Sequence, residues 1–524
     1  MNSIVHNSLA ELIKRIMILI TAISVVLEML LFPSIENMAG CIMMIVTCFV
    51  FTTFFLEERY IIETPFSFLM LCSITLFHFL PVPATLISSR PVSFGMVYAV
   101  KTFGLETIMF LIGCAAFYCT SRHPYSYGLM KKLLNSIGFY NVGSERLIWT
   151  IGFVGLICRL MSLSRGGVAI GILGSVLNFT FYYVYMPILL FFPCLYRQNR
   201  ELDNDLRRKD VWLYIVLVCV LNVATNSRKQ LITPFCIFLL LLVIAMFYKG
   251  DKASTILNPK SLVKATIIVA VLLISFETIS KAMLITRSIR RDVSFTKMIE
   301  LTVDAITNGG LEDTWEKYKD KTKVFEIYDE GWTEEYVKST LLSRFCNIRI
   351  TDETLYLESQ MSEYAKKEMQ DDFEGRLLSA LPEPIIKFFN PSFDKSKYTN
   401  ARGDALYIYS GLGESTNWGE FRVTSHLGDG LATFGLLYFP FQFIMWCIVM
   451  KLLNTFSMCS ESSGIRYSLY GLLTVYDTSL LAFVNGNGIC DDVLFLLRGY
   501  WQDILLATVI IGVSRILSKM RWGK

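Results

Sequence analysis

The sequence predicts an all-α polytopic membrane protein with about twelve transmembrane helices and one large, mainly helical segment outside the membrane. Apolar residues make up 53% of the 524 residues and charged residues 18%, whereas a soluble domain carries about 25% charge. The apolar residues form uninterrupted runs of roughly 17–25 residues, the length at which a helix crosses a ~30 Å hydrocarbon core. These observations exclude a soluble enzyme, a disordered protein and a soluble coiled coil. The runs also lack the ~10-residue alternation of an outer-membrane barrel.

Twelve apolar runs are expected to be helical, because unpaired backbone groups are not tolerated in lipid. They cover approximately residues 14–33, 38–56, 65–88, 96–119, 146–163, 176–196, 211–226, 230–248, 262–282, 429–453, 465–484 and 499–518. The glycine-rich stretch 166–174 fits either a re-entrant turn or the start of the sixth span.

Charge separates one segment from the rest of the chain. Residues 283–427 contain 19 Lys and Arg against 25 Asp and Glu, a net charge of −6. Because the whole chain has a net charge of +4, the remaining residues carry a net charge of +10. About 145 residues can hold a small core, and two periodic, charge-laced stretches at 313–328 and 358–381 predict helices there. We therefore expect a membrane domain over 1–282 with about nine spans, a loop domain over 283–427, and a second membrane domain over 428–524 with about three spans.

The orientation follows from the short loops, because Lys and Arg favour the cytoplasmic side. With twelve spans, five cationic regions fall on one side. They contain Arg122, Lys131 and Lys132; Arg197, Arg200, Arg207, Arg208 and Lys209; Lys249, Lys252 and Lys260; Lys451 and Arg466; and Lys519, Arg521 and Lys524. This places both termini in the cytoplasm and the 283–427 loop outside it.

Several common site types are missing from the sequence. Most of the 13 cysteines lie in apolar runs and there is no CxxC, so neither a disulfide framework nor a zinc site is expected. There is no Walker A, Rossmann, HExxH or external DxD motif, so we expect no metal, no cofactor and no nucleotide hydrolysis. No nucleic-acid partner is indicated. The first apolar run lacks a cleavage signal and should remain as a helix.

Cations at the outer ends of the helices depart from the positive-inside pattern. Arg165 follows the fifth span, Arg228 and Lys229 lie between the seventh and eighth, and Arg290 follows the ninth beside Arg287 and Arg291. Such residues can cap helix carbonyls or contact lipid headgroups. They can also bind phosphate or pyrophosphate, because a guanidinium binds phosphate oxygens in a bidentate fashion.

One histidine stands out among four. His426 is the only one expected on the external side, at the point where the large loop re-enters the membrane. It is either an interface residue or a proton acceptor, since imidazole titrates near neutral pH. Glu414, Glu420 and Asp429 surround it in sequence and either orient the imidazole, act as the base or are solvated loop acids.

Two further residues have alternative interpretations. Arg376, in the acidic loop, is either a salt-bridge partner or a substrate contact. His78, within the third span near Pro81, is expected to be a packed polar residue rather than a ligand.

Four short motifs resemble those of a known superfamily. SRKQLITPFCIFLLLLV and SHLGDGLATFGLL are similar to helix-opening motifs of the O-antigen polymerase and ligase superfamily, and LSRFCNIRITDETL and EGRLLSALPEPI resemble loop segments of its Wzy-type repeat-unit polymerases. The expected layout, with one long periplasmic loop late in the chain, is also similar. Leu427 stands where the ligase motif has Asn, and Lys229 replaces a Gly, so the polymerase is favoured over the ligase.

The resemblance implies a GT-C-like fold in the bacterial inner membrane and a metal-independent, inverting glycosyl transfer. Its substrates would be undecaprenyl-pyrophosphate-linked oligosaccharides, and its partners membrane lipids and a chain-length regulator protein. By position, Arg228 would bind the donor pyrophosphate and His426 would lie at the reaction centre. Arg376 would join Arg228 and His426 in the catalytic set as a phosphate or sugar contact. The remaining pyrophosphate- or sugar-binding residues would be Arg165, Lys229, Arg290, Glu414, Glu420 and Asp429.

A lipid-linked oligosaccharide flippase is the alternative from another class. Twelve spans suit a transporter, and many transporters are built from repeated halves. No internal repeat is visible here, and a loop of about 145 residues is hard to explain in a flippase. The sequence therefore favours an enzyme.

Overall fold

The structure is a computed structural model that describes residues 9–519 apart from several stretches. The stretches left out are 124–127, 164–179, 225–227, 251–274, 284, 287–294, 308–327, 340–341, 382, 461–463 and 482–487. Arg165, Arg290 and most of the expected ninth span, 262–282, lie outside the described residues.

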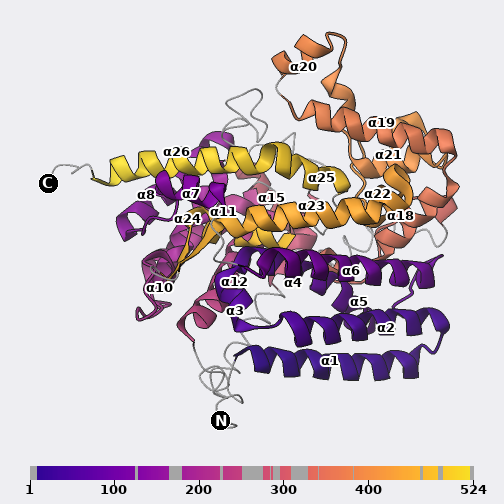
Figure 1. Cartoon of the computed structure of the whole chain (residues 1–524), viewed down its shortest axis with the longest axis horizontal. Helices are drawn as coiled ribbons and strands as arrows, with labels where there is room; N and C mark the ends of the chain where they lie inside the picture. The colour runs from indigo at the N-terminus through magenta and orange to yellow at the C-terminus, as the bar shows by residue number, and fades with distance from the viewer. Residues whose placement is uncertain are drawn as a thin grey trace.

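The N-terminal quarter of the chain forms a layer built mainly of long helices. Its elements are α1 (Leu9–Leu31), α2 (Ile35–Val50) with its π-helical continuation η2 (Phe51–Phe55), α3 (Glu58–Glu63), α4 (Pro65–Phe79), α5 (Pro81–Ile87) and α6 (Ala99–Ser121). Helices α1, α2 and α6 lie side by side along the long axis of the molecule (Figure 1). Proline begins both α4 and α5, where its missing N–H costs no helical bond, and the pair is bent by 49°.

The middle of the membrane body is less regular than the sequence predicts. It contains α7 (Leu129–Ser136), α8 (Glu145–Leu163), η3 (Phe181–Phe191), α10 (Pro193–Tyr196), α11 (Lys209–Ala224) and α12 (Arg228–Lys249). The sixth span was expected as one helix over 176–196. Its described part is instead a 3₁₀ helix that contains Pro187, followed by α10, which begins at Pro193. Proline lacks the N–H that a continuous α-helix needs.

The helix expected over 358–381 is present with a break at 361–362, and the one expected over 313–328 lies, apart from its last residue, outside the described residues. The described part of the segment 283–427 is mainly helical. It contains α15 (Phe295–Thr307), η5 (Tyr328–Glu330), α17 (Ser343–Cys346), α18 (Arg349–Gln360), α19 (Glu363–Ser379), α20 (Glu383–Phe389), η6 (Lys395–Tyr398), α21 (Arg402–Tyr409) and η7 (Ser415–Asn417). Helices α18 to α21 gather at one end of the long helices, opposite α10 (Figure 1).

A buried carboxylate joins this segment to the membrane body. Asp352 of α18 accepts hydrogen bonds from the backbone N–H groups of Val97 and Tyr98, at 2.7 and 3.0 Å, and from the Thr102 hydroxyl at 2.7 Å. The Tyr328 hydroxyl donates a fourth bond to it at 2.9 Å. The first three donors lie at the N-terminus of α6, where a carboxylate satisfies otherwise unpaired N–H groups. Helix α18 is therefore fixed onto the end of α6.

The C-terminal part returns to the membrane body. It contains α22 (His426–Phe434), η8 (Gly435–Leu437), α23 (Tyr438–Leu453), η9 (Asn454–Phe456), the antiparallel strands β1 (Ser457–Ser460) and β2 (Gly464–Tyr467), α24 (Leu469–Leu473), η10 (Val475–Leu481), α25 (Ile489–Leu494), η11 (Phe495–Gly499) and α26 (Tyr500–Lys519). The expected eleventh span, 465–484, differs from one straight helix in its described part. It starts in β2, and Ser468 then caps α24 by accepting a bond from the Gly471 N–H.

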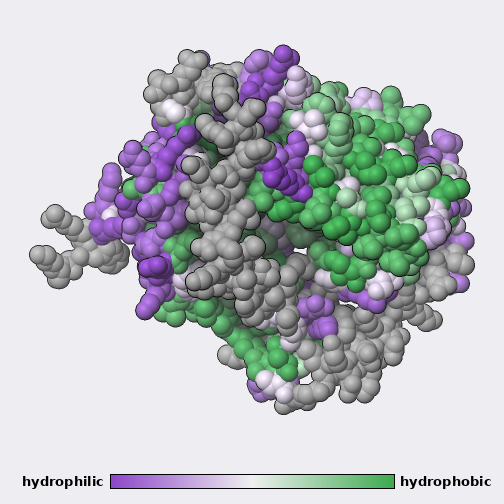
Figure 2. Space-filling model, turned by 90° about the horizontal axis from the view of Figure 1, so that it is seen from below, coloured by the Kyte–Doolittle hydropathy of each residue, from purple (hydrophilic) through white to green (hydrophobic). Residues whose placement is uncertain are grey.

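Among the described residues, five helices are long and apolar enough to cross a membrane. They are Ile35–Phe55, Ala99–Ser121, Arg228–Lys249, His426–Phe456 and Ile489–Lys519, and the bent pair α4–α5 makes a sixth if it is one span. Each overlaps a span predicted from the sequence. The surface of the molecule is also typical of a membrane protein. Helix α1 exposes Leu19, Val26 and Leu30, and Figure 2 shows a broad hydrophobic face with hydrophilic residues at its edge. The chain is a helical, multi-pass membrane protein.

Candidate functional site

A pocket lies where α4, α6, α18, α22 and α23 meet. Its wall mixes apolar side chains, among them Ile74, Met109 and Trp446, with a set of polar ones. The polar residues are His78, Glu106, Asn347, Thr351, Thr424, Ser425 and His426. The pocket therefore brings together two of the four histidines, although 348 positions separate them in the sequence.

His426 is held in this pocket by the start of α22. Ser425 caps the helix, and its hydroxyl accepts a hydrogen bond from the Gly428 N–H at 2.9 Å and contacts the Thr354 hydroxyl at 2.7 Å. The His426 side chain is buried, and its Nε2 atom lies 3.5 Å from Oδ2 of Asp492. This places His426 at the junction between the loop segment and a membrane helix.

Asp492 is a partner that the sequence reasoning missed. Its side chain is fully buried in α25, and Gln442 of α23 donates a hydrogen bond from Nε2 to Oδ2 at 2.6 Å. A carboxylate beside one imidazole nitrogen favours a proton on that nitrogen, which leaves the other nitrogen free to accept one. With Asp492 beside Nε2, the proton-accepting atom of His426 is Nδ1.

His78 forms a second histidine–carboxylate pair in the same pocket. Its Nε2 lies 2.9 Å from Oε2 of Glu106, and the Thr351 hydroxyl donates to the other Glu106 oxygen at 2.7 Å. His78 was expected to be a packed polar residue, and it is buried, but it also lines the pocket. The sequence signal for this pair is Glu106 itself, since a carboxylate within an apolar span requires a partner.

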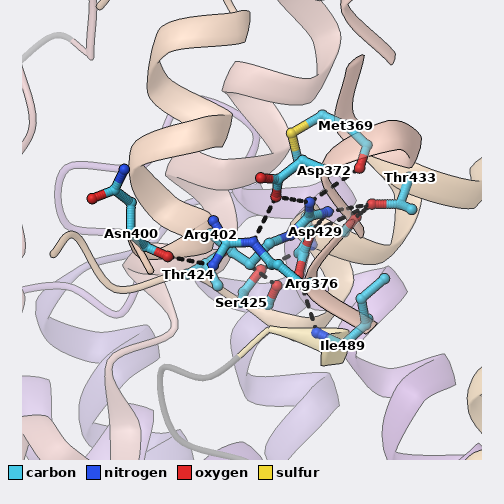
Figure 3. Close-up of polar contacts among 11 residues, drawn as sticks. Met369, Asp372, Arg376, Asn400, Arg402, Thr424, Ser425, Asp429, Thr433 and Ile489 are labelled. Carbon is cyan, nitrogen blue, oxygen red and sulfur yellow. Dashed lines mark hydrogen bonds and ion pairs between the residues drawn. The ribbon is translucent and has the colours of Figure 1, made fainter. Parts of the chain in front are cut away.

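Arg376 and Asp429 lie in a buried ion-pair cluster beside the pocket (Figure 3). Arg402 donates to Asp429 from Nη2 at 2.5 Å and to Asp372 from Nη1 at 2.6 Å. Arg376 donates to Asp372 from Nε at 2.7 Å and also bonds the carbonyl oxygen of Asn400. Two arginines and two aspartates give a net charge of zero. Arg376 is therefore a salt-bridge partner, one of the two roles that the sequence left open.

The cluster positions the pocket through two short helices. Asp429 lies one turn after His426 on α22, and its Oδ2 accepts a hydrogen bond from the Ile489 N–H at 3.0 Å. Ile489 begins α25, the helix that carries Asp492. Asp429 therefore joins α25 to α22 and holds Asp492 against His426. Asp372 and Arg402 were missed by the sequence reasoning, although the i, i+4 spacing of Asp372 and Arg376 indicates a helical ion pair.

The two loop glutamates lie outside the pocket wall. Glu414 is exposed and forms a reciprocal cap with Asn417, whose side chain accepts from the Glu414 N–H at 2.7 Å. Glu420 is exposed and pairs with Arg422. Neither contributes to the surroundings of His426, so both act as solvated loop acids in this structure.

Arg228 and Lys229 begin α12 and are not among the residues that line the pocket. Lys229 pairs with Asp477 of η10, Nζ to Oδ1 at 2.7 Å. The next residue, Gln230, accepts a hydrogen bond from Arg159, a buried arginine of α8 that the sequence reasoning did not single out. The N-terminal end of α12 thus has three basic residues around it, of which Lys229 is paired with Asp477.

Comparisons with known proteins give no relative. No family model, no curated protein and no solved structure matches the chain. Within the described part of the chain, no group of three or more His, Cys, Asp and Glu side chains could hold a metal ion. The site must therefore be interpreted from its own chemistry.

One prediction concerns Glu353, next to Asp352 on α18. Burial raises the pKa of this carboxyl to about 8, from an ordinary 4.5. The folded protein therefore keeps a proton that the unfolded chain has lost, and its stability falls as pH rises from about 4.5 to 8. We expect Glu353→Gln to leave stability at pH 5 nearly unchanged and to raise it at pH 8.

Unfolding of the purified protein in detergent at pH 5 and pH 8 tests this expectation. Glu330→Gln is the matched control, because Glu330 is exposed. If the free energy of unfolding changes equally between pH 5 and pH 8 in wild type and in Glu353→Gln, the expectation is contradicted.

Proposed function

We propose that the chain is a polysaccharide polymerase that joins undecaprenyl-pyrophosphate-linked oligosaccharide repeat units. The observation that carries the proposal is the pocket beneath the loop segment, where a buried His426 at the start of a membrane helix lies beside the Asp492 carboxylate. A base at this place can act on a sugar whose lipid carrier stays in the membrane. The motif resemblance supplies the substrate class.

The reaction is an inverting glycosyl transfer without a metal. The acceptor hydroxyl oxygen bonds to the anomeric carbon of the donor while the bond from that carbon to the pyrophosphate oxygen breaks. The pyrophosphate leaves with the electron pair, and the hydroxyl proton passes to Nδ1 of His426. Asp492 then stabilises the imidazolium, which is the usual contribution of a carboxylate to a histidine base.

The pyrophosphate is assigned to the cationic end of α12. Arg228 and Lys229 occupy the first turn of this helix, where the N–H groups and the helix dipole also favour an anion. Charge that develops on the leaving group is stabilised there by fixed donors. The lipid tails lie sideways between helices, which explains why an enzyme that acts on sugars is built into a membrane.

The orientation belongs to the same proposal. We place the loop segment in the periplasm, both termini in the cytoplasm and the chain in a bacterial inner membrane with about twelve spans. The five cationic regions support this orientation. The gathering of α18 to α21 at the end opposite α10, which precedes one of those regions, agrees with it (Figure 1).

Deletion of the gene in its host tests the function. We expect surface polysaccharide that carries single repeat units, because capped but unpolymerised units would still be exported. Polymer that accumulates on its lipid carrier would instead identify a ligase, and the loss of all external repeat units would identify a flippase. Complementation with the wild-type chain restores long polymer if the effect is specific.

A further inference from the structure

Two residues of the His426 pocket carry buried polar atoms without a hydrogen-bond partner. These atoms are Nε1 of Trp446 and Oδ1 of Asn347. Their residues are 3% and 6% exposed. A buried polar group without a partner is costly and calls for an explanation in a native fold. Together they are one donor and one acceptor, both in residues that line the pocket of His426.

The orientation of the Asn347 side-chain amide is determined by the hydrogen bond that its nitrogen makes. Its Nδ2 donates to the carbonyl oxygen of Glu334 at 2.7 Å, so the amide oxygen is the atom that remains unpaired. Trp446 can only donate. A ligand that pairs with both must accept one hydrogen bond and donate another, as hydroxyl groups do.

The His78–Glu106 pair adds a group that has no net charge. Nδ1 of His78 lies 2.7 Å from the Ile74 carbonyl oxygen, so this nitrogen must carry a proton. A bond between Nε2 and Glu106 then requires one more proton, either on the imidazole or on the carboxyl. In both forms the pair is neutral overall. Both ring nitrogens of His78 are engaged, so the pair can accept a hydrogen bond from a sugar hydroxyl at a Glu106 oxygen.

The charges of the pocket disfavour an anion. No Lys or Arg occurs among the described residues that line it. The carboxylate of Asp492 lies beside His426, and the neighbouring Arg402 and Arg376 are balanced by two aspartates. A pyrophosphate would find no Lys or Arg among these lining residues to compensate its charge. The indole ring of Trp446 instead offers an apolar surface, on which the C–H face of a sugar ring can pack.

We infer that this pocket binds an uncharged sugar residue, the acceptor end of the growing chain, with Glu106, held by His78, as a further sugar-binding group. The inference rests on the proposed polymerase function and assigns the acceptor sugar to this pocket. The acceptor hydroxyl lies at His426, and the anomeric carbon that it attacks must lie between His426 and the pyrophosphate-binding residues at the start of α12.

Tryptophan fluorescence of the full-length protein in nanodiscs tests the inference. The probes are a panel of methyl glycosides of common hexoses, deoxyhexoses and N-acetylhexosamines, and inorganic pyrophosphate. We expect at least one glycoside to change the fluorescence of wild type, and this change to be absent in Trp446→Phe. Glu106→Gln should weaken glycoside binding about 10-fold or more, since bonds to charged or proton-sharing groups are the stronger ones.

Two further variants keep the test decisive. Glu28→Gln alters another buried carboxylate of the membrane body, bonded to the Val92 N–H and outside the pocket, and should leave glycoside binding unchanged. Thr351→Val removes a bond to Glu106 with little change in shape and should weaken binding even if Glu106→Gln does not fold.

The outcomes separate the inference from the proposed function. A Trp446-dependent response to pyrophosphate alone, or to none of the probes, would overturn the sugar site. Glycoside binding in a protein whose deletion leaves polymer length unchanged would keep the sugar site and reject the polymerase.

Discussion

Replacement of His426 by Ala is expected to lower the rate of polymer formation by about 10²–10⁴-fold, the usual contribution of general acid–base catalysis. The side chain is buried beside Asp492 in the pocket, so its loss removes the proton acceptor. Binding of the lipid-linked donor should survive, because the pyrophosphate is assigned to Arg228. The measurement is polymer formation by the purified protein with lipid-linked repeat units.

Two comparisons show whether the loss is due to the proton acceptor. His123→Ala removes an exposed histidine after α6 and should leave the rate unchanged. Asp492→Asn keeps His426 but weakens the control of its tautomer, so a smaller loss is expected. The acid limb of the pH–rate profile should be present in wild type and absent in His426→Ala. A near-normal rate with an unchanged profile would show that His426 is an interface residue.

Arg402→Ala is expected to destabilise the fold by about 3–5 kcal/mol, the usual effect of removing one partner from a buried ion pair. Arg402 is 5% exposed and joins Asp372 to Asp429. After the substitution Asp372 keeps Arg376, but Asp429 keeps no cation within bonding distance among the described residues. Unfolding by SDS, monitored by circular dichroism, measures the change. Arg402→Lys should lose less, because it keeps the charge but not the planar fork.

Arg422→Ala is the matched control for this prediction. Arg422 is also buried and pairs with the fully buried Asp404. Asp404, however, also accepts hydrogen bonds from the N–H groups of Gly419, Phe421 and Arg422, so it remains compensated when the guanidinium is removed. If the two substitutions destabilise the fold equally, the link that Arg402 makes between Asp372 and Asp429 contributes no more stability than any other buried arginine.

The sequence predicted the membrane class, and each of the five long apolar helices among the described residues overlaps a predicted span. The length of an apolar run is a local property set by the thickness of the bilayer. The prediction failed where short-range chemistry interrupts such a run. Pro187 and Pro193 divide the sixth span, and the eleventh begins in a strand. Hydropathy averaged over a window does not register either effect.

The sequence by itself also selected His426, from its place at the end of the acidic loop. It could not supply the partners of His426, because these come from distant positions. His78 and Glu106 on α4 and α6, and Asp492 on α25, meet His426 only when the helices pack. Packing likewise decided that Arg376 is neutralised by Asp372, whereas the loop glutamates stay in solvent. A charge in a sequence has no partner until the fold brings one within a few ångströms, so the tertiary structure determined which charged residues build the site.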